Sequence, residues 1–330
     1  MSGFDPTAGM SEEEKADFLI KLESLKYSFG LEMMEALSNP NVTDVLINPD
    51  GKVFVKEAGK AKRRLPKLAS PSQRRSILHT LAAMLDTEIN EEKPILEGTL
   101  PLNGERFEGL FPPVVTQCSL AIRKPAAKVY TLDDYMRAGI MTFKQAQAIL
   151  EAVRQHKNIL VVGGTGSGKT TLLNAISDAI SVETPYDRLV TIEDVKELMS
   201  SLEDWVPMYS TKRCTMDQCL AATMRYNPDR IGVGEIRHGG PTMTLLKAWN
   251  TGHPGGFATV HADGAEEGLY RVNELIREVM PDDRFEMIAR AINVVVFIDN
   301  RSEDGRKVRE VISVKSWDHH DRKFIFDAIG

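Results

Sequence analysis

Short apolar runs alternate with longer amphipathic stretches through the second part of the chain. From about Thr142 onward, the runs are rich in valine, isoleucine and leucine, and the stretches between them have helical spacing. This alternation is typical of a parallel sheet covered by helices. The expected strands are residues 159–162, 188–193, 230–234, 257–261 and 293–298, and the segment from Val308 to Phe326 adds strands at an edge.

The first part of the chain also alternates helices with short strands but carries no catalytic pattern. Ser70 and Gln73 form a capping box with Pro71 at the first helical position, which predicts the start of a helix. The other expected elements are a helix over residues 11–37, a hairpin of residues 42–47 and 53–55, and strands around residues 107 and 120–122. We therefore expect a smaller α+β domain over residues 1–130, a linker over 131–141, and an α/β domain over 142–330.

Length and composition are those of a soluble protein with about two domains. The chain has 330 residues, enough for each domain to bury its own core. No apolar stretch approaches the roughly 18 to 20 residues that a membrane-spanning helix requires. The chain start also lacks a secretory signal pattern, so we expect a cytoplasmic protein and leave peripheral membrane contact open.

Charge and cysteine content narrow the classes of function further. The formal net charge is −6, which argues against a chain that coats nucleic acid through bulk electrostatics. A local basic run is formed by Lys60, Lys62, Arg63, Arg64 and Lys67. This run is either a solvated loop or a contact for anionic lipid, nucleic acid or a protein partner. The scattered cysteines at 118, 214 and 219 indicate neither a disulfide framework nor a zinc site.

A glycine-rich segment after the first strand of the second part has the pattern G-x-x-x-x-G-K-T. It consists of Gly163, Gly164, Thr165, Gly166, Ser167, Gly168, Lys169 and Thr170. The segment follows the apolar run 158–162 and precedes the helical stretch 172–176, which is the strand, loop and helix order of a phosphate-binding loop. A glycine-rich turn that binds nothing is the alternative, but it leaves this complete pattern unexplained.

The residue types in this segment match the chemistry of a triphosphate. Triphosphate oxygens need many converging N–H donors, and a backbone with little side-chain bulk can wrap around them. We expect Lys169 to reach the β and γ phosphates, the Thr170 hydroxyl to bind Mg²⁺, and Thr171 to support it. The sequence therefore predicts a site for a nucleoside triphosphate and Mg²⁺.

Acidic residues follow two further strands of the predicted sheet. Glu193 and Asp194 come at the carboxyl end of a core strand, where ligands of open α/β sheets bind, so we expect Glu193 to face water or, through water, Mg²⁺. The alternative is a helix cap by Asp194. Glu235 ends the strand 230–234 and is our predicted catalytic base, because a glutamate there can polarise the water that attacks the γ phosphate. Its alternative interpretation is a surface acid.

Two histidines flank a short strand that follows a glycine-rich turn. His253 lies in the turn, and His261 ends the strand. An imidazole near the γ phosphate can donate a hydrogen bond to it and relay its presence to neighbouring elements. We expect this role for His261, while a structural role stays open for either histidine.

These four segments, taken in order, resemble the secretion or traffic ATPases, in which they correspond to the Walker A loop, the Asp box, an atypical Walker B with glutamate, and the His box. They cover most of residues 150–265. The resemblance implies a RecA-like P-loop ATPase core with a parallel sheet, and ATP hydrolysis coupled to conformational work. Type II secretion and pilus-assembly members often carry a tetracysteine zinc element that this chain lacks. The resemblance therefore favours the type IV secretion branch and, within it, the conjugal transfer ATPases.

The same resemblance implies partners and two further site residues. It implies a homohexameric ring at the cytoplasmic face of the inner membrane, beside secretion or conjugation subunits. In the family, arginines of the amino-terminal domain reach phosphates bound by the carboxyl-terminal domain, and Arg106 and Arg123 resemble those positions. A guanidinium can grip a γ phosphate with two hydrogen bonds and lose that grip after hydrolysis. Without the resemblance, each arginine reads as a surface charge.

The expected function is an ATP-hydrolysing motor for type IV secretion or conjugative DNA transfer. Three alternatives stay open: a type II secretion or pilus assembly and retraction ATPase, a RecA-like DNA helicase or recombinase, and a nucleotide-gated docking ring with little hydrolysis. A small-molecule kinase is disfavoured, because transfer to an acceptor needs a second pocket that excludes water.

Overall fold

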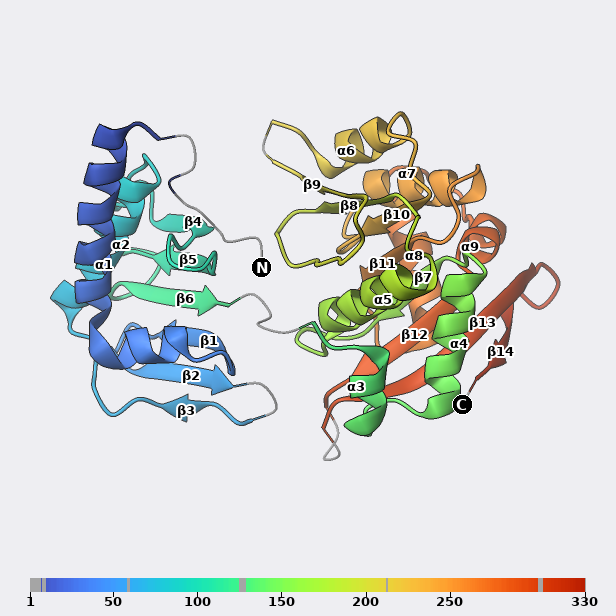
Figure 1. Cartoon of the computed structure of the whole chain (residues 1–330), viewed down its shortest axis with the longest axis horizontal. Coiled ribbons are helices and arrows are strands. Elements are labelled where there is room, and N and C mark those ends of the chain that lie inside the picture. The colour runs from blue at the N-terminus through green and yellow to red at the C-terminus, as the bar shows by residue number, and fades with distance from the viewer. Residues whose placement is uncertain are drawn as a thin grey trace. The chain divides into compact units, whose positions relative to one another are not determined.

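The chain forms two compact units, Met1–Ala127 and Lys128–Gly330 (Figure 1). The computed structural model describes residues 7, 10–57, 60–124, 129–211, 213–301 and 305–329, so residues 125–128 lie outside the described residues. The range 131–141, which we expected to link the domains, instead carries helix α3 (Leu132–Arg137). A capping box at Thr131 starts this helix, and its Leu132 and Tyr135 are buried in the core of the second unit.

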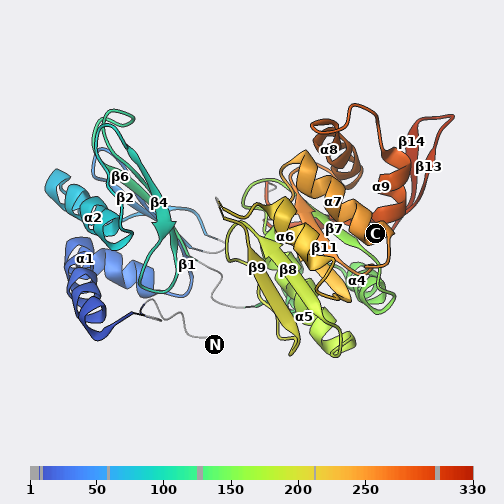
Figure 2. The same ribbon diagram turned by 90° about the horizontal axis from the view of Figure 1, so that it is seen from above.

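The first unit is an antiparallel sheet with two helices on one of its faces (Figure 2). Its strand order is β3-β2-β1-β6-β5-β4. Both long helices begin at serine capping boxes, at Ser11 and at Ser70, which satisfy free N–H groups of the first turn. The elements are α1 (Glu12–Ser38), β1 (Val42–Ile47), β2 (Val53–Glu57), β3 (Arg63–Arg64), α2 (Pro71–Met84), β4 (Ile95–Thr99), β5 (Arg106–Leu110) and β6 (Ser119–Arg123).

The second unit is an eight-stranded sheet of order β14-β13-β12-β7-β11-β10-β8-β9. The pairs from β12 across to β9 are parallel, and β13 and β14 form an antiparallel edge. The strands are β7 (Ile159–Val162), β8 (Leu189–Glu193), β9 (Trp205–Tyr209), β10 (Arg230–Val233), β11 (Phe257–Val260), β12 (Val294–Asp299), β13 (Lys307–Asp318) and β14 (Lys323–Ala328). The helices after α3 are α4 (Phe143–Arg154), α5 (Lys169–Glu183), α6 (Met216–Thr223), α7 (Gly239–Asn250), α8 (Ala265–Arg277) and α9 (Phe285–Ala291). The sequence pattern missed β9, whose residues are only partly buried.

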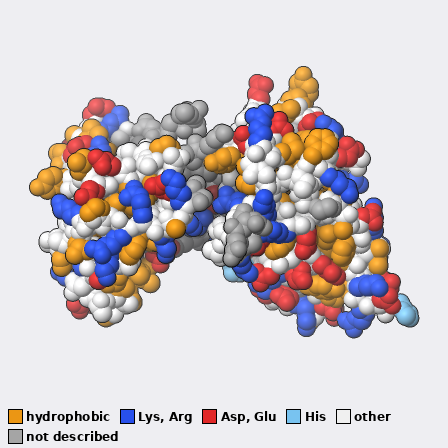
Figure 3. Space-filling view, turned by 90° about the horizontal axis from the view of Figure 1, so that it is seen from below, with side chains coloured by type: hydrophobic (Ala, Val, Ile, Leu, Met, Phe, Trp, Pro, Cys, Tyr) orange, Lys and Arg blue, Asp and Glu red, His pale blue; other side chains and the backbone are white. Residues whose placement is uncertain are grey.

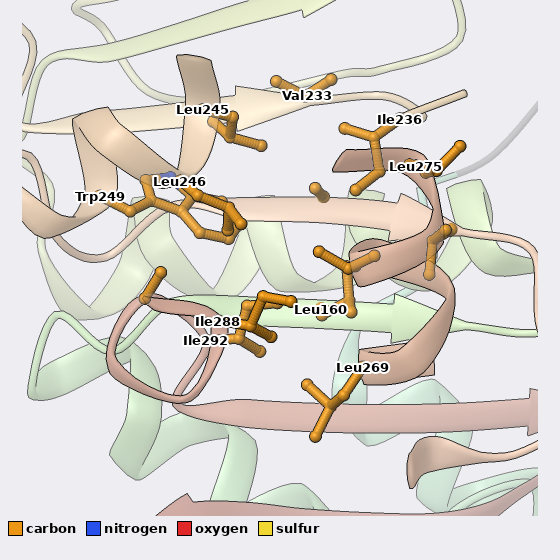
Figure 4. Packing of buried hydrophobic residues seen from close by; sticks show 14 of the residues in the cluster. Leu160, Val233, Ile236, Leu245, Leu246, Trp249, Leu269, Leu275, Ile288 and Ile292 are labelled. Atoms are coloured by element: carbon orange, nitrogen blue, oxygen red, sulfur yellow. The ribbon is translucent and has the colours of Figure 1, made fainter. Parts of the chain in front are cut away.

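The central strands are buried on both faces because helices cover the sheet from each side. Along β7, Leu160 and Val162 pack into the cluster formed with α7, α8 and α9, part of which Figure 4 shows. Ile159 and Val161 point the other way, into the cluster formed with α4 and α5. Two-sided burial explains the continuous apolar runs in the sequence. The helices connect successive parallel strands, so the carboxyl ends of these strands meet at one edge.

The surface is polar and mixed in sign. On the face shown in Figure 3, basic and acidic side chains are interspersed on both units. The basic run at residues 60–67 has its lysines and arginines exposed, and Glu57 pairs with Lys60 and Arg63. Its contact with lipid, nucleic acid or a partner stays a prediction. Within the described residues, no helix combines the length and apolarity needed to cross a bilayer.

Candidate nucleotide-binding site

The phosphate loop connects β7 to α5 at the carboxyl edge of the sheet. Gly166 and Gly168 have φ angles of 71° and 99°, which favour glycine strongly because other residues are strained there. Gly168 is the N-cap of α5 and makes no side-chain cap. The first-turn N–H groups of a helix have no intrahelical acceptor, so this turn presents donors and the positive end of the helix dipole. The loop therefore has the backbone of an anion site.

The side chains of the loop differ in their exposure. Thr165 is exposed, while Thr170 and Thr171 are half-buried in the first turn of α5. The Ser167 hydroxyl is buried and has no hydrogen-bond partner among the described residues. Thr170 lies in the first turn of α5, and its role in binding Mg²⁺ stays a prediction.

Lys169 folds back over its own loop. Its Nζ donates to the carbonyl oxygens of Gly163 and Gly164, at 2.9 and 3.0 Å. The side chain is buried, with 7% of its surface exposed. The buried ammonium is thus held by loop carbonyls, and the terminal phosphates of a nucleotide bound in the loop would replace these carbonyls as its hydrogen-bond acceptors.

His261, at the end of β11, bridges Lys169 and Glu235. Its Nδ1 lies 3.2 Å from Lys169 Nζ, and its Nε2 lies 2.8 Å from Glu235 Oε1. The second contact lacks the alignment of a hydrogen bond, so Glu235 Oε1 is buried without a hydrogen-bond partner among the described residues. Burial, and then the charge of Lys169, lower the pKa of His261, while Glu235 opposes this. The imidazole is therefore neutral at pH 7.

Glu235, which follows β10, is ionised in this setting. Burial by itself would raise the pKa of Glu235. The hydrogen bond and the charge of Arg237, together with His261 and the charge of Lys169, outweigh burial and hold the pKa below its ordinary value. Arg237 Nη2 donates to Glu235 Oε2 at 2.7 Å. Arg237 thus anchors one oxygen of the carboxylate, and the other lies beside His261 Nε2.

Glu193, at the end of β8, has a different environment. Only 2% of its surface is exposed, and burial raises its pKa to about 7, although the backbone N–H groups of Glu197 and Leu198 donate to its Oε1. Its Oε2 is buried and lacks a hydrogen-bond partner in the described part of the chain. The side chain also packs behind Gly234, where an added Cβ would lie 3.2 Å from Glu193 Cγ. The carboxyl of Glu193 is therefore close to the midpoint of its titration at neutral pH.

Asp194 and His253 lie away from the phosphate loop's immediate contacts. Asp194 does not cap a helix. Instead, it accepts from the Ser210 hydroxyl at 2.5 Å and lies 3.9 Å from Arg237. His253 is far from the loop along the sheet, because its Nδ1 contacts the carbonyl of Pro228 at 3.1 Å, before β10 begins. Its expected alternative, a structural role, fits this place.

A small open pocket adjoins the acid and the histidine. It has a volume of about 200 Å³ and is lined by Glu235, Ile236, Arg237, Val260, His261 and Arg271. The pocket therefore lies beside the two residues that the proposed hydrolysis chemistry needs.

Arg106 and Arg123 lie in the first unit, on adjacent strands. They are register partners across the antiparallel pair of β5 and β6, and both are exposed. On the other side of β6, Arg123 is the register partner of Asp44 on β1.

The sequence interpretation missed cations that reach the loop from the hairpin between β12 and β13. Asn300 Nδ2 donates to the Gly166 carbonyl at 2.8 Å, and the side chains of Arg301 and Arg306 lie against Gly164 and Gly168. In the sequence they are two arginines in a polar loop, and no local pattern links them to the phosphate loop. Their proximity follows from the strand order, which places β12 beside β7.

Comparison with known proteins places this geometry in a family. The chain matches the model of the Type II/IV secretion system protein family over residues 29–320. It is 40% identical over 294 residues to the probable conjugal transfer protein TrbB of Sinorhizobium fredii, covering 89% of this chain and 90% of that protein. It is 30% identical to the type IV secretion system protein PtlH of Bordetella pertussis, covering 83% of this chain and 90% of that protein.

The comparison of folds agrees with the sequence comparison. A crystal structure of the pilus retraction motor PilT with bound ADP has a TM-score of 0.60 at 19% identity, covering 85% of this chain and 80% of that chain. The expected α/β P-loop core preceded by an α+β domain is confirmed. Because the family model spans most of the chain and the TrbB relative matches nearly all of it, this chain belongs to the Type II/IV secretion system protein family.

Proposed function

We propose that this chain is the ATP-hydrolysing motor of a conjugative DNA-transfer or type IV secretion apparatus. Membership of the family and the relatives named as conjugal transfer and type IV secretion proteins support the cellular role. The bridge from Lys169 through His261 to Glu235 is the observation that carries the chemical role. Through His261, the Lys169 ammonium is linked to the ionised carboxylate of Glu235.

Hydrolysis follows from the roles of these groups. Lys169 leaves its loop carbonyls for the phosphate oxygens of ATP, and the loop amides hold the β and γ phosphates. Glu235 accepts a proton from the attacking water, since its lowered pKa keeps it ionised. A bond forms from the water oxygen to the γ phosphorus, the bond from that phosphorus to the bridging oxygen breaks, and ADP leaves. Neutral His261 contacts Lys169, so a movement of Lys169 toward the phosphates changes the contacts of the imidazole.

The residues present also fit Mg²⁺, which would neutralise charge that develops on the phosphates. The Thr170 hydroxyl is placed in the first turn of α5 to hold it. The orphaned Oε2 of Glu193 is suited to a metal-bound water, because a buried carboxylate oxygen without a donor lacks a partner. Glu193 therefore supports the catalytic groups rather than replacing Glu235 as base.

The amino-terminal unit contributes cations in this proposal. Arg106 and Arg123 grip the γ phosphate when the domains close and release it after hydrolysis, which converts chemistry into motion. The two arginines lie side by side on β5 and β6. The working form is a homohexameric ring, placed peripherally at the cytoplasmic face of the inner membrane beside the other subunits of the apparatus.

The test is phosphate release by the purified chain and by Glu235→Gln. Glu274→Gln is the matched control, because Glu274 is an exposed acid on α8 and loses the same charge. We expect Glu235→Gln to keep Mg-ATP binding and to lose turnover by about 10²- to 10⁴-fold, the usual contribution of a general base. The control should turn over ATP like the wild type.

Two outcomes would overturn the proposal. If Glu235→Gln turned over ATP at the wild-type rate, Glu235 would not be the base, and a nucleotide-gated docking ring with little hydrolysis would gain support. If the folded wild-type chain bound no Mg-ATP, the nucleotide site itself would be wrong.

A further inference from the structure

The end of β12 and the start of β13 pack directly on the phosphate loop. Asn300 Nδ2 donates to the Gly166 carbonyl at 2.8 Å. A Cβ added to Gly163 would lie 2.3 Å from the carbonyl oxygen of Ile298, so the strand end and the loop are in close contact. This hairpin therefore forms one wall of the site, although the catalytic segments recognised in the sequence do not include it.

Two guanidinium groups of the hairpin lie against the two ends of the loop. A Cβ on Gly164 would be 2.7 Å from Arg301 Nη2, and a Cβ on Gly168 would be 2.8 Å from Arg306 Nε. At these distances a side chain at either position would displace the arginine, because real Cβ atoms essentially never come this close to another heavy atom. The glycines at 164 and 168 thus make room for cations as well as for phosphate.

The two arginines differ in their present partners. Arg301 is exposed and pairs with Asp263 at 2.9 Å, an exposed ion pair that holds it only weakly. Arg306 Nε is buried and has no hydrogen-bond acceptor among the described residues. A buried donor of a charged group without an acceptor is costly, and an anion bound in the loop would remove that cost.

The direction of approach separates Arg306 from the hydrolytic groups. In the sheet, β7 has β11 on one side and β12 on the other. His261 follows β11 and Glu235 follows β10, so the catalytic groups reach the loop from one flank. Arg306 reaches it from the opposite flank, while Arg301 starts on that flank and extends to Asp263, which follows β11.

We infer that Arg306, with Arg301 beside it, binds the diphosphate part of the nucleotide, which ATP and ADP share, and does so within the same chain. This inference rests on the proposed nucleotide site and adds a cation subsite to it. In this arrangement Lys169 addresses the terminal phosphates, and the hairpin holds the part of the nucleotide that remains after hydrolysis. Release of ADP then requires these arginines to lose their contacts with the diphosphate.

The experiment measures the affinity of the full chain for Mg-ATP and Mg-ADP by titration calorimetry. Arg306→Gln removes the charge and keeps most of the stem, while Arg306→Lys keeps a charge without the fork. Lys315→Gln is the control, because Lys315 is an exposed cation on β13 of the same hairpin and its loss changes net charge equally. Melting followed by tryptophan fluorescence checks that each variant is folded.

We expect Arg306→Gln to weaken both nucleotides by the same factor, about 10- to 100-fold, as the loss of a charge-assisted hydrogen bond predicts. Arg306→Lys should fall between this variant and the wild type, and Lys315→Gln should bind like the wild type. If both Arg306 variants bound ATP and ADP like the wild type, Arg306 would only brace the loop. If only ATP binding fell, Arg306 would address the γ phosphate. Either result overturns the inference while leaving the nucleotide site intact, whereas failure of the wild type to bind would count against the proposed function.

Discussion

The protonation of Glu193 gives a prediction whose size follows from the structure. Burial raises its pKa from 4.5 to about 7. Each tenfold change in a protonation equilibrium is worth about 1.4 kcal/mol, so the ionised form costs the folded state up to about 3 kcal/mol relative to the protonated form. Because the folded pKa is the higher one, this stability is fully present below pH 4.5 and is lost as the pH rises to about 7.

Glu193→Gln removes this titration while keeping an oxygen acceptor for the N–H groups of Glu197 and Leu198. The amide also places a buried donor where Oε2 lay, which costs about 1–3 kcal/mol independently of pH. The informative quantity is therefore how the difference in unfolding free energy, variant minus wild type, changes with pH. We expect that difference to rise by about 2–3 kcal/mol between pH 5 and pH 8 and then to level off.

Denaturant unfolding followed by tryptophan fluorescence is a suitable assay. All three tryptophans, at 205, 249 and 317, lie in the second unit, so the signal reports the unit that contains Glu193. Glu274→Gln, at an exposed acid, should show a difference that does not vary over this range. A difference for Glu193→Gln that stayed flat from pH 5 to pH 8 would show that burial does not control this carboxyl.

Other predictions test the loop, the histidine and the sheet. Lys169→Ala should lose most ATP affinity or turnover, because the phosphates then lack their main side-chain cation, and unchanged steady-state kinetics would contradict that role. His261 should contribute an acid limb to ATP turnover at a pH below the ordinary histidine value, because its pKa is lowered, and His261→Gln should remove that limb. A limb that survives the substitution belongs to another group. Gly232→Ala should destabilise the fold by about 1–3 kcal/mol and so lower the melting temperature, because the new Cβ would lie 2.5 Å from the Phe257 ring. A melting curve like that of the wild type would show that the ring can move aside.

Local patterns predicted most elements of the fold because their causes are local. Capping boxes at Ser11 and Ser70 mark helix starts, and two-sided burial leaves the largely apolar runs of β7, β8 and β11. An element with a weak local signal was missed. The strand β9 lies at the edge of the sheet, and its residues are only partly buried.

The candidate site divides in the same way. The sequence by itself determined the phosphate loop, since its glycines, lysine and threonine are contiguous and their chemistry is a property of the backbone that they form. It also placed Glu193, Glu235 and His261 at strand ends. Only the tertiary structure decided that His261 bridges Lys169 and Glu235, that Glu193 is buried enough to titrate near pH 7, and that Arg301 and Arg306 reach the loop. The physical reason is that contact across a sheet depends on strand order and on what packs behind each side chain, and a one-dimensional pattern records neither.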